Sequence, residues 1–121
     1  MQNSNPNGIH YFLEFFGCDV RQIDSVDFWK DILPRSVEGT DIKILHDHYY
    51  KFEPQGVTAF LLLSASHISV HSWPEHGYVA CDVFACGEEK DTDAIVRSLS
   101  EHISHERVRI NKVQRGFTVD K

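Results

Sequence analysis

The sequence predicts an α+β fold, an antiparallel sheet with helices on one face. Two observations carry this prediction. Strand-like segments, apolar or alternating, run through most of the chain, and two stretches between them place apolar residues at helical spacing. The expected order is β-α-β-β-β-β-α-β, and a row of strands joined only by turns favours antiparallel pairing. With 121 residues, the chain is expected to form one domain over residues 1–121.

Each element follows from a local pattern. The strands are expected at residues 9–16, 42–50, 57–63, 67–73, 78–85 and 107–113. The nearly continuous apolar run at 57–63 predicts a strand that is buried on both faces. The first helix is capped at Asp24–Ser25 and is limited by Pro34, and the second is capped by Asp91 and runs to Ile103.

Composition argues against several classes of protein. The formal charge is −6 and the basic residues are scattered, so no nucleic-acid partner is expected. No apolar run approaches the roughly 20 residues that cross a bilayer, so no membrane partner is expected. Residues 1–7 are polar and lack the features of a signal peptide, which predicts a short disordered lead and a cytoplasmic protein. The three cysteines form no C-x-x-C pair, which argues against a disulfide framework or a cysteine zinc site.

Ser66, His71 and Cys86 are the first candidates for chemistry, because they bring a hydroxyl, an imidazole and a thiol into two adjoining segments. An offset of five residues places Ser66 and His71 on opposite faces of a regular strand. If they cooperate, either a turn or bulge lies between them or the partner group comes from another strand. Spacing alone favours a serine at a strand edge and an unrelated histidine.

A metal site is the weaker interpretation of the eight histidines. His46 and His48 would share one face of a strand. His67 and His71 have a spacing that binds zinc well on a helix, whereas their segment is expected to be a strand. No metal is therefore expected.

The chain resembles the prokaryotic S-adenosylmethionine decarboxylase proenzymes, over roughly residues 8–116. The resemblance is carried by motifs in the family's order and spacing: Gly8-Ile9-His10, Gly17-Cys18-Asp19, Phe52-Glu53-Pro54-Gln55-Gly56-Val57-Thr58, the run SHISVHSWPE from Ser66 to Glu75, Gly77-Tyr78, Asp82-Val83-Phe84 and Cys86-Gly87. It implies a domain that forms half of the family's sandwich. It also implies a homodimer whose active sites contain residues of both protomers.

The resemblance implies that Ser66 is the precursor of a pyruvoyl cofactor. Its hydroxyl would attack the carbonyl of Ala65, and elimination from the resulting ester would cut the chain between Ala65 and Ser66. His71 matches a histidine that transfers protons during processing, and Thr58 matches a hydroxyl, usually serine, that assists it. Cys86 matches the thiol that protonates the product, after a Schiff base to the pyruvoyl group has formed and carbon dioxide has left.

The same resemblance implies a small-molecule substrate of polyamine biosynthesis. Phe52 matches an aromatic residue that packs on the adenine of S-adenosylmethionine, and Glu75 matches a carboxylate that binds the ribose hydroxyls. Taken without the resemblance, the two residues fit a core phenylalanine and an exposed turn glutamate equally well.

Three substitutions depart from the family pattern. Ala65 replaces the usual glutamate at the cleavage site, Ala59 replaces a common glycine, and His76 replaces a common tyrosine. Ala65 keeps the backbone carbonyl that the serine attacks, so the cleavage chemistry remains available. The substitutions leave two alternatives open: a pyruvoyl-dependent ornithine or arginine decarboxylase on the same scaffold, and an unprocessed, non-catalytic ligand-binding homologue.

Overall fold

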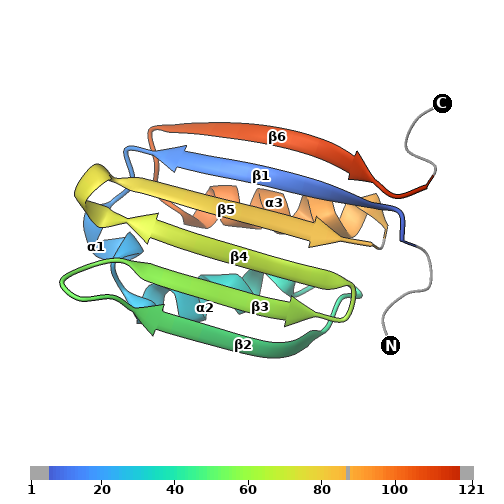
Figure 1. Cartoon of the computed structure of the whole chain (residues 1–121), viewed down its shortest axis with the longest axis horizontal. Helices are drawn as coiled ribbons and strands as arrows, with labels where there is room; N and C mark the ends of the chain where they lie inside the picture. Colours follow the sequence, from blue (N-terminus) through green and yellow to red (C-terminus); the bar gives the residue numbers. More distant parts are fainter. Residues whose placement is uncertain (1–5, 87, 118–121) are drawn as a thin grey trace.

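The computed structural model describes residues 6–86 and 88–117, so residues 1–5 of the expected lead lie outside the described part. Six strands of the described chain form one antiparallel sheet in the order β2-β3-β4-β5-β1-β6 (Figure 1). The strands are β1 (Gly8–Phe16), β2 (Ile44–Lys51), β3 (Val57–Leu63), β4 (Ser66–Trp73), β5 (Tyr78–Ala85) and β6 (Arg107–Arg115). The predicted α+β fold with an antiparallel sheet is confirmed.

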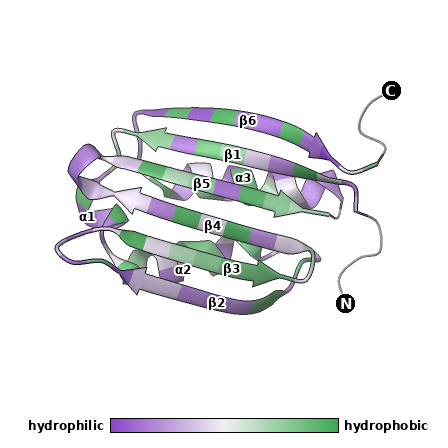
Figure 2. Cartoon of the chain, in the orientation of Figure 1, coloured by the Kyte–Doolittle hydropathy of each residue, from purple (hydrophilic) through white to green (hydrophobic). Residues whose placement is uncertain are grey.

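The helices cover one face of this sheet and leave the other face open (Figure 1). They are α1 (Val20–Ile23), α2 (Val26–Val37) and α3 (Glu89–His102), and a 3₁₀ turn, η1 (Pro74–His76), joins β4 to β5. Side chains that point toward α2 and α3 form the core, among them the fully buried Leu61, Ile68 and Val83. The alternation between apolar and polar residues along the strands is visible in Figure 2.

Three expectations about individual elements were wrong. The strand at 57–63 is buried on one face only, because helices pack on a single side; Phe60 and Leu62 are 39% and 42% exposed on the other side. Helix α2 passes through Pro34, which lacks a backbone N–H donor, and ends at Val37. The burial of Val37 in the core stabilises this last turn. Helix α3 begins at Glu89, so Asp91 lies in its first turn and does not cap it.

The short helix α1 was not expected from the sequence. Asp19 caps it, since its carboxylate accepts a hydrogen bond from the backbone N–H of Arg21 at 3.0 Å. Its last residue, Ile23, is fully buried and its carbonyl accepts a 3.0 Å hydrogen bond from the indole of Trp29. In the described residues, the helices are too short or too polar to span a membrane.

Candidate active site

The candidate residues lie in two groups at opposite ends of the sheet. Ala65, Ser66 and Cys86 are at the end where β3 turns into β4 and where β5 finishes, whereas Thr58 and His71 are near the other end, joined there by the predicted substrate residues. Strand β4 pairs residue for residue with β5 along its whole length. An offset of five residues along an extended strand separates Ser66 from His71 by about 17 Å. A single chain therefore does not bring these two residues together.

The expected cleavage site is a tight hairpin turn. Leu63 pairs with Ser66, so only Ser64 and Ala65 connect β3 to β4. Two-residue hairpin loops favour residues such as glycine that accept a positive φ. This turn has no glycine, and the positive φ of 132° falls on Ser66 itself. The candidate nucleophile is therefore held in a conformation that L-amino acids rarely adopt, which stores strain next to the Ala65–Ser66 peptide bond.

Hydrogen bonds fix this turn from both sides. The backbone N–H of Ser64 donates to the carbonyl of Lys43 at 2.8 Å, and the Lys43 N–H donates to the Ser64 hydroxyl at 3.0 Å. On the other side, the carbonyl of Ala65 accepts a 2.9 Å hydrogen bond from the backbone N–H of Cys86. Cys86 is buried, and the Ala65 side chain packs against the core. The Ala65–Ser66 peptide thus lies between the start of β2 and the end of β5.

The opposite end of the sheet holds a pocket of about 320 Å³. His71 and Thr58 are cross-strand neighbours on its floor, with 3.1 Å between His71 Nδ1 and Thr58 Oγ1. Phe52 and Glu75 line the same pocket, together with Gln55, Gly56, Ser72 and Trp73. The structure therefore brings four predicted residues into one cavity: an aromatic ring, a carboxylate, an imidazole and a hydroxyl.

The Phe52 side of this pocket is held by the β2–β3 loop. The Phe52 N–H donates to the Gly56 carbonyl at 2.8 Å, and the Gly56 N–H donates to the Asp24 carboxylate at 2.8 Å. Gly56 has φ 108°, which a residue with a Cβ adopts only with strain. Phe52 is 46% exposed, which excludes the alternative of a core phenylalanine, and its ring is available to a ligand.

A second pocket, of about 430 Å³, lies beside the first and shares His71 with it. Two carboxylates line it, Glu14 and Asp82; Glu14 accepts hydrogen bonds from the Tyr78 hydroxyl at 2.7 Å and from Arg109 Nε at 2.9 Å. The hydrogen bond from Arg109, followed by that from Tyr78, lowers the pKa of Glu14. Glu14 is thus an ionised and already paired group at neutral pH.

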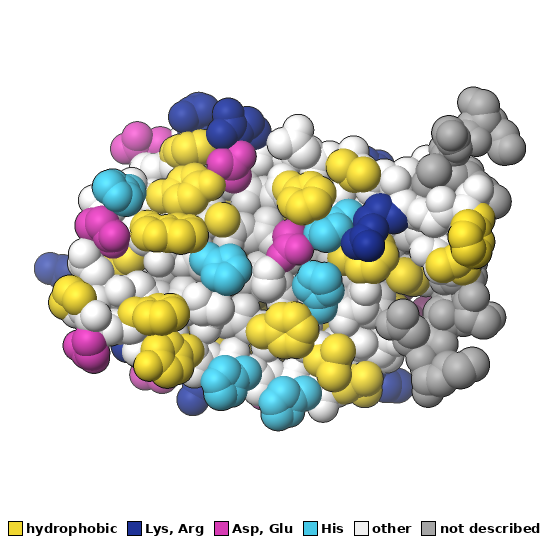
Figure 3. All heavy atoms as spheres, in the orientation of Figure 1, with side chains coloured by type: hydrophobic (Ala, Val, Ile, Leu, Met, Phe, Trp, Pro, Cys, Tyr) yellow, Lys and Arg dark blue, Asp and Glu magenta, His cyan; other side chains and the backbone are white. Residues whose placement is uncertain are grey.

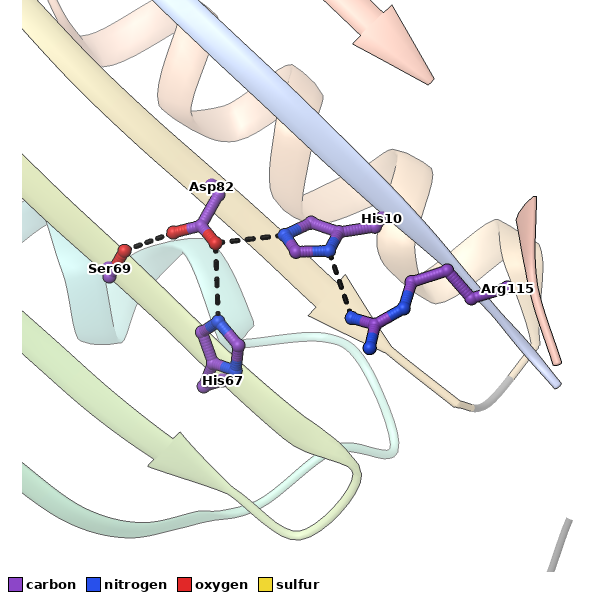
Figure 4. A network of polar contacts seen from close by, with 5 residues as sticks. All are labelled: His10, His67, Ser69, Asp82 and Arg115. Carbon is purple, nitrogen blue, oxygen red and sulfur yellow. Dashed lines mark hydrogen bonds and ion pairs between the residues drawn. The ribbon is translucent and has the colours of Figure 1, made fainter. Parts of the chain in front are cut away.

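A charged network occupies the middle of the open face (Figure 4). The Asp82 carboxylate on β5 accepts hydrogen bonds from His10 Nε2 at 2.8 Å, from His67 Nε2 at 3.3 Å, and from the Ser69 hydroxyl. Arg115 donates to His10 Nδ1 at 3.1 Å, so both ring nitrogens of His10 are engaged. Burial acts to raise the pKa of Asp82, but the hydrogen bonds from His67, Ser69 and His10 outweigh it and hold this pKa well below its usual range.

This network also bears on metal binding. His10, His67 and Asp82 are the group of described residues whose ligand atoms come closest to a metal-binding arrangement, all within 4.8 Å of one another. Each Nε2, however, donates its hydrogen to Asp82, and the guanidinium of Arg115 occupies the other nitrogen of His10. A ligating imidazole must offer a lone pair to the metal, so the hydrogen-bonded arrangement favours an internal ion cluster.

Sequence reasoning assigned no role to the Asp82 network. One signal was present, because Asp82 is the only charged residue of the strand 78–85. Its partners were not identifiable, since His10 and Arg115 come from β1 and β6 and meet it only in the folded sheet.

Cys18 and Cys81 are buried thiols, as the sequence predicted. Burial raises the pKa of Cys18 to about 11, and burial, with a smaller contribution from the Asp82 charge, raises the pKa of Cys81 further. Neither is a thiolate at neutral pH, which leaves Cys86 as the cysteine placed at the candidate site.

Comparison with solved structures defines the class of protein. The adenosylmethionine decarboxylase of Aquifex aeolicus has the same fold, with a TM-score of 0.88, 30% sequence identity, and coverage of 98% of both chains. This similarity extends over the sheet, the helices and both ends of the candidate site.

Sequence comparison identifies the family. Residues 9–116 match the model of the S-adenosylmethionine decarboxylase family. The chain is 34% identical over 113 residues to the S-adenosylmethionine decarboxylase proenzyme of Pyrococcus abyssi, covering 93% of this chain and 81% of that protein. It is 34% identical over 110 residues to the proenzyme of Clostridium botulinum strain Langeland, covering 91% and 95%. The chain belongs to the S-adenosylmethionine decarboxylase family, and the expected resemblance is confirmed.

We expect Asp82→Asn, made in the uncleavable Ser66→Ala chain, to lower the free energy of unfolding by about 2 kcal/mol, because hydrogen bonds to a charged acceptor contribute about 1.5–3 kcal/mol. The pKa of Asp82 is lower in the folded than in the unfolded chain. Its stabilisation is therefore complete above the unfolded value of about 4 and is lost as the pH falls below it. Urea unfolding at about pH 5 and about pH 3 measures the difference between the variants, which should shrink at the lower pH.

The matched control for this experiment is Asp31→Asn. Asp31 is exposed on α2 and pairs with Arg35 one turn away, so its removal should change stability by less than about 0.5 kcal/mol. If Asp82→Asn lowers the free energy of unfolding by the same amount at both pH values, the lowered pKa of Asp82 is contradicted.

Strain at Ser66 predicts an unusual order of stability between two uncleavable variants. Ser66→Gly should be more stable than Ser66→Ala by about 1 kcal/mol, because glycine adopts a positive φ without steric cost. At Ser69, in the middle of the same strand, the order should reverse, with alanine more stable by about 0.5–1 kcal/mol. Urea unfolding of the four variants tests this, and an alanine preference at both positions argues against strain at Ser66.

Proposed function

We propose that the chain is a self-processing, pyruvoyl-dependent decarboxylase that acts on S-adenosylmethionine and forms a homodimer. The observation that carries the proposal is the strained turn at Ala65–Ser66, in a chain whose relatives are named proenzymes. A turn that strains a serine and holds the preceding carbonyl suits a bond that the serine itself must cleave.

The cleavage chemistry follows from the atoms of this turn. Ser66 Oγ attacks the carbonyl carbon of Ala65; a C–O bond forms, the Ala65–Ser66 C–N bond breaks, and the hydroxyl proton passes to the Ser66 nitrogen. Loss of the Ser66 Cα proton then expels the Ala65 carboxylate and leaves dehydroalanine. Tautomerisation and hydrolysis consume one water, release ammonia and leave a pyruvoyl group at the start of residues 66–121. Ala65 supplies only its backbone carbonyl to these steps, so the absent glutamate does not prevent them.

Residues around this end suit the group that Ser66 would become. When present, the pyruvoyl group supplies an electrophilic carbonyl that binds an amine substrate and accepts electrons as carbon dioxide leaves. Cys86 stands next to Ala85, which pairs directly with Ser66 across β4 and β5. A thiol at this position suits the proposed proton donor to the product carbon. The burial of Cys86 excludes bulk water, which would compete as a proton source.

The pocket at the other end suits an adenosyl group. Phe52 offers a half-exposed ring for stacking on a purine, and Glu75 offers an exposed carboxylate, which can accept hydrogen bonds from two neighbouring hydroxyls. A cavity of about 320 Å³ is open enough to admit part of a ligand of this size. Ornithine and arginine have neither a purine nor a ribose, so this pair of residues favours S-adenosylmethionine.

The open face of the sheet supports dimer formation. Large apolar side chains on it are partly exposed beside the histidines and Asp82 (Figure 3): Phe12, Tyr50, Phe60, Leu62, Trp73 and Val113. An exposed apolar patch of this kind is typical of an interaction surface. Asp82 already has three donors, so a second protomer can cover it without leaving a charge unpaired.

Dimer geometry resolves the separation of Ser66 from His71. A two-fold axis that lies between two facing sheets and runs across the strands places each strand over its own copy, in the opposite direction. The Ser66 end of β4 then faces the partner's Thr58–His71 end. The positive φ interrupts the regular pleat at Ser66, so alternation does not confine its side chain to the helix face. The processing histidine is thus proposed to act in trans.

The first prediction is self-cleavage. Mass spectrometry under denaturing conditions should find two fragments, residues 1–65 and a pyruvoyl-blocked 66–121, because the strained serine attacks its own carbonyl. Ser66→Ala should leave one intact chain, whereas Ser64→Ala, which keeps the nucleophile, should still be cut. An intact wild-type chain after prolonged incubation would instead favour the non-catalytic ligand-binding alternative.

Cleavage in trans predicts a specific pattern of complementation. Ser66→Ala and His71→Ala chains, each uncut or slowly cut alone, should yield cleaved product when co-expressed with tags of different length. Only the His71→Ala chain should be cut, because it retains Ser66 and receives the partner's His71. Mixed dimers of wild-type and Ser66→Ala chains provide the control for assembly. Absence of cleavage in the mixed dimers, with normal cleavage of the wild type, argues against the shared site.

Substrate choice is predicted from Phe52 and Glu75. Processed protein should release carbon dioxide from S-adenosylmethionine in preference to ornithine or arginine. Phe52→Ala and Glu75→Gln should each weaken binding by about 1–3 kcal/mol, seen as roughly a 5- to 150-fold rise in KM, through loss of stacking and of charge-assisted hydrogen bonds. Gln55→Ala, on the rim of the same pocket, serves as the control. Release from an amino acid alone would identify the ornithine or arginine alternative.

A further inference from the structure

We infer that the backbone N–H of Cys86 is the oxyanion donor for self-cleavage, a catalytic role separate from that of the Cys86 thiol. The inference rests on the proposed cleavage at Ala65–Ser66 and identifies a group that acts on the reacting carbonyl. It assigns to Cys86 one function before cleavage, through its main chain, and another after it, through its side chain.

The hydrogen bond is directed at the atom on which charge develops. When Ser66 Oγ adds to the carbonyl carbon of Ala65, the carbonyl oxygen becomes an oxyanion before the C–N bond breaks. The Cys86 nitrogen lies 2.9 Å from that oxygen. Donors of oxyanion holes lie about 2.7–3.1 Å from the charged oxygen, and a donor held in place before reaction needs no reorganisation when charge appears.

The donor is positioned by the sheet. Ser66 pairs with Ala85, the last residue of β5. The backbone N–H of the next residue, Cys86, therefore lies opposite Ala65 and donates to its carbonyl. Gly8 packs against this segment so closely that a Cβ there would lie 2.6 Å from the Ala85 carbonyl oxygen and 3.2 Å from the Cys86 Cα. The Cys86 amide is buried with its residue, which strengthens its interaction with a developing charge.

The acceptor is equally constrained. Reciprocal hydrogen bonds between Ser64 and Lys43 hold the first turn residue to the start of β2. The second turn residue, Ala65, is then bonded to Cys86, and the positive φ follows immediately at Ser66. Breaking the peptide after Ala65 relieves this backbone conformation, so strain and the oxyanion donor act on the same bond.

The test removes the N–H and keeps the thiol. A recombinant 1–80 thioester is ligated to a synthetic 81–121 segment at the natural Ala80–Cys81 junction, with the amide nitrogen of Cys86 replaced by an ester oxygen. Removal of one oxyanion donor slows catalysis by about 100- to 1000-fold. We expect cleavage of the refolded ester chain to slow by at least about 100-fold relative to the all-amide ligated chain.

Two ligated controls separate the possible outcomes. The all-amide chain reports on self-cleavage itself; if it stays intact, the proposed function fails and this inference fails with it. An ester at Ile103, whose N–H donates to the Leu99 carbonyl at 3.0 Å, removes an equivalent backbone hydrogen bond far from the turn. This control should cleave at the all-amide rate. If the Cys86 ester also cleaves at that rate, self-cleavage stands and the oxyanion donor is refuted.

Amide hydrogen exchange provides a measurement that does not depend on refolding of the ester chain. In the uncleavable Ser66→Ala protein, the Cys86 amide should exchange slowly, like the amides of the neighbouring β4–β5 ladder, because it is donated to Ala65. Exchange of Cys86 at the rate of an unprotected amide would overturn the inference.

Discussion

Alternation of side chains across β1, β3, β4 and β5 governs where the polar groups of these strands lie, among them Thr58, His71 and Asp82. The helices cover one face only, and the residues directed at them are committed to the core. All polar groups of these strands that are available for chemistry therefore share the open face with large apolar side chains. That mixture is unusual for a solvated surface, and it is what a face needs if it must both carry reactive groups and accept a second protomer.

The stiffness of β4 has the largest consequence for function. An extended strand cannot fold back on itself, so its serine and its histidine remain at opposite ends of the sheet. In this chain each half of the proposed active site is well formed and chemically incomplete. The Asp82 network in the middle is complete within one chain. Its carboxylate accepts its hydrogen bonds from the same chain, so the proposed second protomer need not supply a partner for this charge.

The turn at Ser64–Ala65 shows how backbone strain is maintained beside the proposed cleavage site. The two-residue turns that suit the twist of the flanking strands require a positive φ, which glycine accepts without steric cost and serine and alanine do not. The unfavourable φ persists because both neighbours of the turn, Lys43 and Cys86, hold it by backbone hydrogen bonds. The same contacts that stabilise the turn direct a donor at the Ala65 carbonyl, so structural support and the proposed preparation for reaction coincide.

Periodicity was sufficient to predict the six strands and the two main helices, since each depends on the local chain, and the motifs were sufficient to identify the family. Phe52, Thr58 and Glu75 were candidates only through the family resemblance, and their meeting with His71 in one pocket is a result of the tertiary structure. Burial of the strand at 57–63 could not be predicted, because it depends on whether helices cover one face or two. The partners of Asp82 could not be predicted for a similar reason: they come from strands whose neighbours are set by the sheet order. The separation of Ser66 from His71 follows from the extended strand that holds both, whereas the positive φ of Ser66 is set by a turn geometry that exists only once the hairpin has closed.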